Sequence, residues 1–346
     1  MRRRLMTALV TALTTTVLLV GPALACGGLI GPNGAVNLLR TTTFAGYHDG
    51  IEHYVTAFQF AGGGGAFGSL TPLPGVPSSV EKGGDWTLQR LVRETDPIPV
   101  DEALPVAAQR DSAEVLMEVR IDALDVTVLR GGAAEVGRWA TDNGFRLPPD
   151  APEVLDFYAS RSPIFLAAVF DADAAAARGQ AVGDGTPVHI TIPTSNPWVP
   201  LRILALGKTG DEIVEASVYL LTDQQPALLP VPDGTNGMRL DHSAPATGEL
   251  LADLRSDRGM EWVPATGWLT KVALDGRAGQ FVYDLAIDAS GRGAPSLVDA
   301  GLQFGGDQLP GRRAPLPLML WSMFWLGAIV LVGFAGRRAT GLPTVR

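Results

Sequence analysis

Residues 46–55, GYHDGIEHYV, place two of the chain's four histidines, an aspartate and a glutamate within six positions. Imidazole and carboxylate groups at this density are typical of a metal site or of an acid–base site. The same stretch has Asp49 and Gly50 between strand-forming residues, which is the strongest short signal for a β-hairpin. The geometry of such a hairpin decides whether the four side chains can act together.

A two-residue type I′ turn at Asp49 and Gly50 separates these side chains. The cross-strand pairs that it predicts are His48 with Ile51, Tyr47 with Glu52 and Gly46 with His53. Because side chains alternate between the faces of a sheet, the two histidines become diagonal neighbours, roughly 7–8 Å apart at Cα, and Glu52 faces away from them. Zinc needs three or four ligands, so the histidines form at most a half-site that requires His189 or His242 as well. We favour a hairpin tip in which Tyr47 and Glu52 form a cross-strand pair.

A second candidate is the run Asp241, His242 and Ser243. Catalytic triads are assembled from residues that converge in space, whereas neighbours in a chain usually point apart. The chain also lacks the Gly-x-Ser-x-Gly elbow of serine hydrolases. We therefore expect a polar loop at this position.

Three further features carry weaker signals. Asp171 and Asp173 place two carboxylates at the end of a predicted strand, but the spacing lacks the pattern of a calcium loop. His189 alternates with apolar neighbours, which predicts a surface or groove histidine on the opposite face. Trp198 could stack on a ligand, although a tryptophan that plugs a loop onto the core is the favoured interpretation. The sequence thus assigns no catalytic, cofactor-binding or metal-binding residue, and no cofactor.

The elements that must position these side chains are mostly strands. Strands are predicted at 41–60, 113–131, 162–172, 186–193, 200–207 and 212–222, and a final hairpin at 267–275 and 280–288. Helices are predicted at 85–95, 131–145, 150–160 and 248–256, with Asp85 and Asp150 as N-caps and Glu153 completing a capping box. Asn143 and Gly144 are expected to stop the second of these helices. Residues 223–247 are expected to form a loop. This order favours an α+β fold with a mainly antiparallel sheet and a few short helices.

The N-terminus predicts a signal peptide over residues 1–25. A basic start, an apolar stretch and the small residues Ala23 and Ala25 match the requirements for cleavage. Cleavage after Ala25 would leave Cys26 first, which raises the alternative of lipidation, although Leu24 stands one position away from its usual place. A retained N-terminal helix is the other alternative.

The C-terminus predicts a membrane span. Residues 316–335 contain no charge, and 20 helical residues cross the roughly 30 Å hydrocarbon core. Together with the signal peptide, this span puts an extracytoplasmic domain at 26–312 outside the cell membrane and a short cytoplasmic tail at 336–346 inside. The alternative is a sorting signal that is clipped after export.

The composition limits the partners. The chain has 27 basic and 36 acidic residues, and six of the basic ones lie in the signal peptide and tail. The exported part is therefore strongly acidic, which argues against nucleic acid as a partner. Cys26 is the only cysteine, so the domain has no internal disulfide.

Four segments carry a resemblance to a known family: ACGGLIGPNG, GGDWTLQRLVRET, WATDNGFRLPPDAPEVLDFYAS and VHITIPTSNPWVPLRILALG. Together they resemble the bacterial domain-of-unknown-function family 2330, in an actinobacterial type. The resemblance implies a location in the cell envelope and gives no activity. We expect a single-pass membrane-anchored protein with a binding or structural domain, whose partners are the membrane and an envelope protein or wall component. The alternative is an extracytoplasmic metal-dependent or acid–base hydrolase with a dispersed site.

Overall fold

The structure is a computed structural model that describes residues 28–31, 34–35, 41–59, 66–96, 118–171, 174 and 185–302. The predicted signal peptide at 1–25, Cys26, Asp173, the predicted span at 316–335 and the tail at 336–346 lie outside the described residues. Within the described part of the chain, no helix is both long and apolar enough to cross a membrane. The described residues belong to one compact unit that ends at Leu302.

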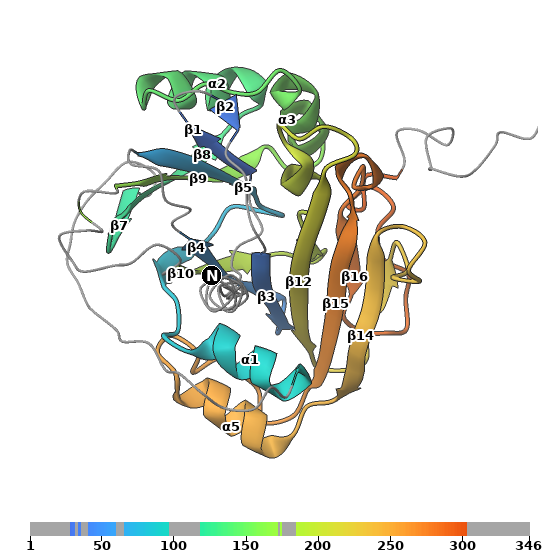
Figure 1. The fold of residues 1–346 in the computed structure, drawn as a ribbon. Coiled ribbons are helices and arrows are strands. Elements are labelled where there is room, and N and C mark those ends of the chain that lie inside the picture. The colour runs from blue at the N-terminus through green and yellow to red at the C-terminus, as the bar shows by residue number, and fades with distance from the viewer. Residues whose placement is uncertain are drawn as a thin grey trace, which may run out of the picture. The chain divides into compact units, whose positions relative to one another are not determined.

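Two large β-sheets and one small sheet form the centre of this unit (Figure 1). Sheet A has the strand order β2 (Gly34–Ala35), β1 (Gly28–Gly31), β5 (Phe67–Pro72), β9 (Ile164–Phe170), β8 (Leu124–Arg130) and β7 (Glu118–Ile121). Sheet B has the order β14 (Met238–Pro245), β15 (Trp268–Arg277), β12 (Ile213–Thr222), β3 (Thr41–His48), β4 (Ile51–Gln59), β10 (Gly185–Pro193) and β6 (Ser79–Lys82). Sheet C consists of β11 (Trp198–Val199), β16 (Leu285–Asp288) and β13 (Ala227–Leu229).

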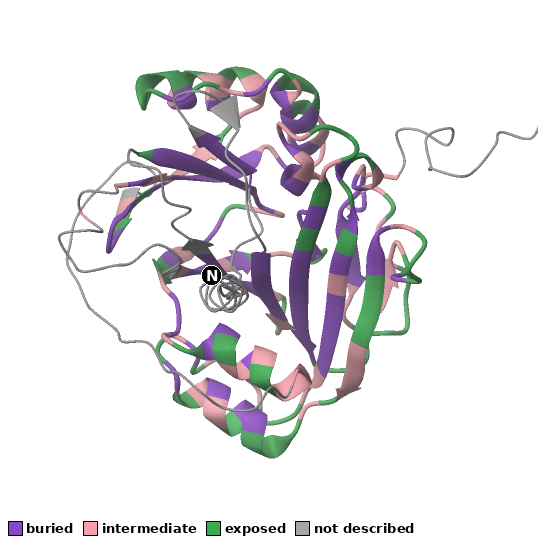
Figure 2. Ribbon diagram, viewed as in Figure 1, coloured by how far each residue is buried: buried purple, intermediate pink, exposed green. Residues whose placement is uncertain are grey.

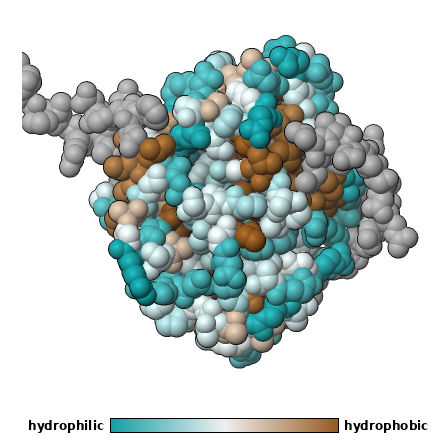
Figure 3. Space-filling view, turned by 180° about the vertical axis from the view of Figure 1, so that it is seen from behind, coloured by the Kyte–Doolittle hydropathy of each residue, from teal (hydrophilic) through white to brown (hydrophobic). Residues whose placement is uncertain are grey.

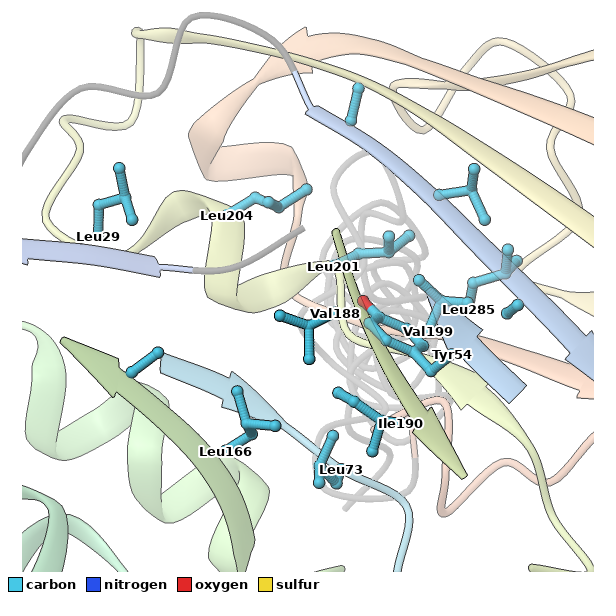
Figure 4. Packing of buried hydrophobic residues seen from close by; sticks show 14 of the residues in the cluster. Leu29, Tyr54, Leu73, Leu166, Val188, Ile190, Val199, Leu201, Leu204 and Leu285 are labelled. Carbon is cyan, nitrogen blue, oxygen red and sulfur yellow. The ribbon is translucent and has the colours of Figure 1, made fainter. Parts of the chain in front are cut away.

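The main core lies between sheets A and B. Alternate residues of the facing strands point into it, as the two-residue period of a strand requires. Figure 4 shows Leu166 of β9 and Leu73, which follows β5, near Val188 and Ile190 of β10. All four side chains are fully buried. In β9 the side chains of Leu166 and Ala168 belong to this core, and those of Phe165 and Ala167 point to the opposite face of sheet A.

Helices cover the outer face of each sheet. Helices α2 (Ala133–Asp142) and α3 (Ala151–Ala159) pack on sheet A, and α1 (Thr87–Thr95) and α5 (Gly248–Ser256) pack on sheet B (Figure 1). Figure 2 shows that each helix has buried residues on one side and exposed residues on the other. The described residues also include two 3₁₀ helices, η1 (Arg202–Ala205) and η2 (Ala278–Gln280).

The predicted fold class is confirmed. Among the named strands every pairing is antiparallel except that of β3 with β12, and the helices are short. The strand segment predicted at 113–131 contains the two short antiparallel strands β7 and β8. Helix α2 ends where Asn143 and Gly144 were expected to stop it, and Gly144 has the positive φ of 77° that such a stop uses.

Three predicted elements are wrong. Residues 200–207 form the 3₁₀ helix η1 and its flanks instead of a strand, because Asp284 accepts hydrogen bonds from the amides of Leu201 and Arg202. The expected loop at 223–247 contains strands β13 and β14. Strands β15 and β16 do not form a hairpin, because β15 pairs with β12 and β14 while β16 joins sheet C.

The side-chain caps predicted for Asp85 and Asp150 do not form. Helix α1 begins at Thr87 after Trp86, and the side chain of Asp257 binds its first turn, accepting from the amide of Trp86 and the Thr87 hydroxyl at 3.0 and 2.7 Å. Asp150 occupies the N-cap position of α3 as predicted, but its side chain accepts from the amide of Gly207 at 2.9 Å, and Glu153 accepts from Arg202 instead of completing a capping box. In each case a contact distant in sequence replaces the local one.

Candidate functional site

The β3–β4 hairpin has the predicted register. His48 pairs with Ile51, Tyr47 with Glu52 and Gly46 with His53. Asp49 and Gly50 have φ values of 49° and 78°, which are the positive values of a type I′ turn. The two faces of this hairpin therefore carry different chemistry, and each has a candidate site.

The first face brings His53 together with His189. Nδ1 of His53 lies 3.0 Å from Nε2 of His189, on the neighbouring strand β10. One of these nitrogens donates and the other accepts, so a single N–H lies between the two imidazoles. Both histidines are buried, which corrects the expectation that His189 lies at the surface or in a groove.

Trp262 covers this histidine pair. Its ring stacks on the His53 ring at 3.8 Å between centroids and at an interplanar angle of 2°. Gly46, the cross-strand partner of His53, makes room for the indole, because a Cβ at Gly46 would lie 2.0 Å from a Trp262 ring carbon. The turn after α5, which carries Trp262, thereby closes over the outer face of sheet B.

Burial keeps the histidine pair neutral. Desolvation, together with smaller effects of the nearby His189 and His48, lowers the pKa of His53 to about 3. Desolvation also lowers the pKa of His189 to about 4, against a smaller raising effect of Glu261. Two neutral imidazoles can bind a transition metal, but no third ligand joins them in the described part of the chain, where no group of three metal-ligating side chains occurs.

His48 is not part of the buried pair. Its Nδ1 lies 2.7 Å from Asp223 and its Nε2 lies 3.4 Å from Asp49, both at the surface. The structure thus joins His53 to His189, one of the two residues named as a third ligand, but directs His48 to a different partner. His242 lies on β14 opposite Lys271, outside this cluster.

The second face of the hairpin carries Glu52, which is completely buried. Neither carboxyl oxygen makes a hydrogen bond of ordinary length and angle to a described residue. Desolvation raises the pKa of Glu52 to about 8, against a smaller lowering effect of the nearby backbone amide of Trp198. Glu52 is therefore a neutral acid at pH 7. The sequence predicted its pairing with Tyr47 and gave no sign of its burial.

A surface pocket of about 270 Å³ lies next to this face. Tyr47 of β3 forms part of its wall, with Ser195, Asn196 and Pro197 from the loop between β10 and β11. The rest of the lining comes from β16 and the chain that follows it: Ala286, Ile287, Asp288, Ala289, Ser290, Ala294, Pro295, Ser296 and Asp299. The hydroxyl of Tyr47 donates to the carbonyl of Thr194 at 3.0 Å, which fixes the ring in the wall.

The other sequence candidates have structural partners. Asp241 accepts from Arg239 at 2.6 Å and Ser243 accepts from the Trp268 indole at 2.9 Å, so the Asp-His-Ser run is not aligned as a triad. Asp171 accepts from the amide of Ala174 at 2.8 Å. Trp198 is 1% exposed and stacks on Tyr158, which confirms that it plugs a loop onto the core.

Sequence reasoning missed a buried charge cluster around Asp284. Arg161 donates to Asp284 at 2.6 Å, and both side chains are fully buried. The hydroxyl of Tyr158 donates to the same carboxylate at 2.9 Å and accepts from the amide of Ile203 at 2.8 Å. Asp284 lies 123 positions after Arg161 and 126 positions after Tyr158, so no local signal in the sequence links the three residues. Every polar atom of the Asp284 carboxylate is engaged, which indicates a structural role.

The comparison with known families covers the part of the chain that contains the hairpin. The model of DUF2330, an uncharacterized protein family conserved in bacteria, matches residues 22–228, more than half of the chain. The chain belongs to the DUF2330 family. The match includes the β3–β4 hairpin, His189 and the Ser195–Pro197 wall of the pocket, whereas Trp262 and Asp299 lie beyond it. No curated protein matches this DUF2330 chain.

Solved structures similar to this DUF2330 protein include those of baculovirus P35. A mutated baculovirus P35 after caspase cleavage has 7% identity and a TM-score of 0.37, covering 72% of this chain and 98% of that chain. Baculovirus P35 has 9% identity and a TM-score of 0.35, covering 72% and 96%. The caspase-8/P35 complex has 10% identity and a TM-score of 0.34, covering 72% and 90%. Similarities at this level carry no argument about function.

Proposed function

We propose that this DUF2330 protein is an exported cell-envelope protein, anchored by one membrane span at residues 316–335, whose extracytoplasmic domain binds a ligand without catalysing a reaction. The signal sequence at 1–25 and the uncharged 20-residue segment support the location. The acidic composition of the exported part supports a soluble domain that avoids nucleic acid.

The observation that carries the binding role is the separation of the histidine pair and of Glu52 from the pocket. The histidine pair is buried beneath Trp262 on the outer face of sheet B, and neither His53 nor His189 lines the pocket. Among the described residues, the pocket lining contains serines but no histidine, lysine or cysteine that could activate them. Its carboxylates are those of Asp288, which is held by hydrogen bonds within its own loop, and Asp299. A cavity lined by polar groups without a paired nucleophile and histidine is suited to binding.

The large exposed apolar side chains of the described residues do not form one continuous patch that would indicate a second binding surface besides the pocket. Figure 3 shows hydrophobic groups in separate places among hydrophilic ones on the face turned away from the view of Figure 1. The large apolar residues that are most exposed in the described part come from different elements: Val76, Trp86, Ile213, Val231, Leu240 and Leu297. Single exposed apolar side chains of this kind are normal for a protein surface.

The second candidate, an acid–base hydrolase, is favoured by Glu52 alone. A carboxyl with a pKa of about 8 is protonated at neutral pH, as a general acid must be. Glu52 is, however, fully buried and does not line the pocket. A catalytic role would require the neighbouring wall of Tyr47 and the loop before Trp198 to open.

Protease accessibility tests the proposed topology. Protease added to intact cells should remove the domain while sparing an epitope tag fused after Arg346. Digestion of the tag would contradict the predicted orientation. The same cells, fractionated without protease, should retain the full-length chain in the membrane pellet after a high-salt wash.

Turnover and metal content test the binding role. Full-length protein, solubilised in detergent, should release no soluble product from isolated cell envelopes over the background of a detergent blank. Elemental analysis should find less than stoichiometric metal, both in the wild type and in the His48→Ala and His53→Ala variants. Product release that Glu52→Gln abolishes would establish the hydrolase instead, and stoichiometric metal lost in the histidine variants would establish a metal site.

A further inference from the structure

The pocket beside Tyr47 has an apolar floor and an aromatic wall. Pro197, Ala286 and Ile287 are buried residues that line it, and Tyr47 is half-buried. Because the Tyr47 hydroxyl is engaged with the carbonyl of Thr194, the ring is held and cannot turn freely. The volume of about 270 Å³ lies just below the roughly 300–1,000 Å³ of pockets for drug-sized ligands, so the site suits something about the size of one sugar ring.

Part of the polar lining serves to shape the pocket. The Asp288 carboxylate accepts from the amide and hydroxyl of Ser290 and from the amide of Gly293, at 2.7–3.1 Å. The Ser296 hydroxyl accepts from the amide of Asp299 at 3.1 Å. These bonds fold the chain after β16 into the second wall, and they leave the Asp288 carboxylate satisfied.

Other polar groups of the lining are available to a ligand. The side chains of Ser195 and Asn196 on one wall, and the carboxylate of Asp299 on the other, make no hydrogen bond to any described residue. Ser195 and Asn196 are exposed. An amide, a hydroxyl and a carboxylate can together donate to and accept from the hydroxyl groups of a polyol.

The charge of the lining selects the class of ligand. Asp288 and Asp299 are acidic, and no lysine, arginine or histidine is among the described residues of the lining, which disfavours phosphate and carboxylate ligands. A sugar ring meets both sides of the pocket, since its hydroxyls hydrogen-bond to amide and carboxylate groups and its C–H face packs on an aromatic ring. We propose that this pocket binds one neutral sugar ring of a cell-envelope glycan, recognised by Tyr47, Asn196 and Asp299.

This inference rests on the proposed function, because an envelope glycan is a ligand only for an exported domain. It names the wall component that such a domain would bind. It also assigns different roles to the residues: the Tyr47 ring stacks on the sugar, and the side chains of Asn196 and Asp299 bind ring hydroxyls.

Saturation-transfer NMR tests the proposal with the full-length chain in a detergent that has no sugar head group. The probes are glucose, galactose, mannose and N-acetylglucosamine. At least one should give a saturable signal with a dissociation constant in the millimolar range or tighter. Asn196→Ala and Asp299→Asn should each weaken binding about tenfold, as the loss of one or two hydrogen bonds implies.

The matched control is Asp142→Asn, which removes a carboxylate from an exposed position on α2 away from the pocket. It should bind like the wild type. Tyr47→Phe keeps the ring and should keep most of the affinity, whereas Tyr47→Ala should abolish the signal. Because Asn196 is exposed and makes no side-chain hydrogen bond to the described residues, its variant tests the pocket even if Tyr47→Ala fails to fold.

Two outcomes would overturn the proposal: no saturable signal for any of the four sugars, or binding that neither Asn196→Ala nor Asp299→Asn weakens. Neither outcome affects the protease and turnover tests of the proposed function. Conversely, hydrolysis of a bound sugar would leave the ligand class intact and contradict the non-catalytic role.

Discussion

Nδ1 of His53 and Nε2 of His189 lie 3.0 Å apart across the pairing of β4 with β10, although 136 positions separate the residues in the chain. One hydrogen bond joins the two neutral rings, and the Trp262 indole stacks over them. Protonation of both rings would place two positive charges next to each other in a buried site. This relationship makes the stability of the protein sensitive to acid.

The free energy of unfolding should therefore fall as the pH is lowered below about 6.5. The pKa values of His53 and His189 are lowered in the folded protein to about 3 and about 4, so the unfolded chain binds more protons in this range. The slope is at most about 1.4 kcal/mol per pH unit for each histidine. Urea unfolding at pH 7, 6, 5 and 4 measures it.

The double variant His53→Gln/His189→Gln is the comparison that isolates this effect. The difference in unfolding free energy between the wild type and this variant should shrink as the pH falls from 6.5 toward 4. The control His242→Gln should show the same pH dependence as the wild type, because His242 lies outside the pair. Parallel curves for the wild type and the double variant would contradict the prediction.

Gly46 should tolerate no side chain. A Cβ there would lie 2.0 Å from the Trp262 ring, so Gly46→Ala must displace the indole from the histidine pair. We expect a loss of about 1–3 kcal/mol of unfolding free energy, which is typical of overpacking, together with a change in tryptophan fluorescence. In Gly248→Ala the new Cβ meets nothing within 4 Å, so this control should unfold like the wild type.

Glu52 should reduce stability at alkaline pH. Its pKa rises from 4.5 to about 8 on folding, so the folded protein holds a proton that the unfolded chain releases. The contribution of Glu52 is most favourable below pH 4.5 and is lost as the pH rises toward 8, by about 1.4 kcal/mol per pH unit, levelling off above pH 8. Relative to the wild type, Glu52→Gln should gain stability across this interval.

Glu81→Gln is the matched control for Glu52→Gln, since Glu81 is an exposed glutamate on β6 of the same sheet. Its unfolding free energy should follow that of the wild type at every pH between 4.5 and 9. A Glu52→Gln curve that also runs parallel to the wild type would show that Glu52 is ionised in the folded protein.

Loss of the buried ion pair between Arg161 and Asp284 should be costly. Arg161→Met leaves a carboxylate in a site without solvent access, and such changes cost about 3–5 kcal/mol. Thermal and urea unfolding measure the loss. Arg277→Met, which removes an exposed pair with Asp211, should change stability little, and equal effects of the two variants would contradict the prediction.

Local signals in the sequence predict much of the fold. The Asp49-Gly50 turn fixes the β3–β4 register, since both positions need positive φ and few residues tolerate it. Alternation predicts the strand β10 around His189, and Asn143 with Gly144 predicts the end of α2. These successes depend on neighbours within a few positions. The side chains of Asp257 and Asp150, whose partners at the start of α1 and in the loop at Gly207 are distant in sequence, show where that range ends.

The sequence by itself determined the family, the α+β class and the separation of Glu52 from the histidines, because turn chemistry and strand period are local properties. Only the tertiary structure decided that His53 meets His189, that Glu52 is sealed in the core, and that Asn196 and Asp299 face one pocket. These contacts join segments about 100 or more positions apart. Their energies depend on burial and packing, which a single strand or turn does not encode.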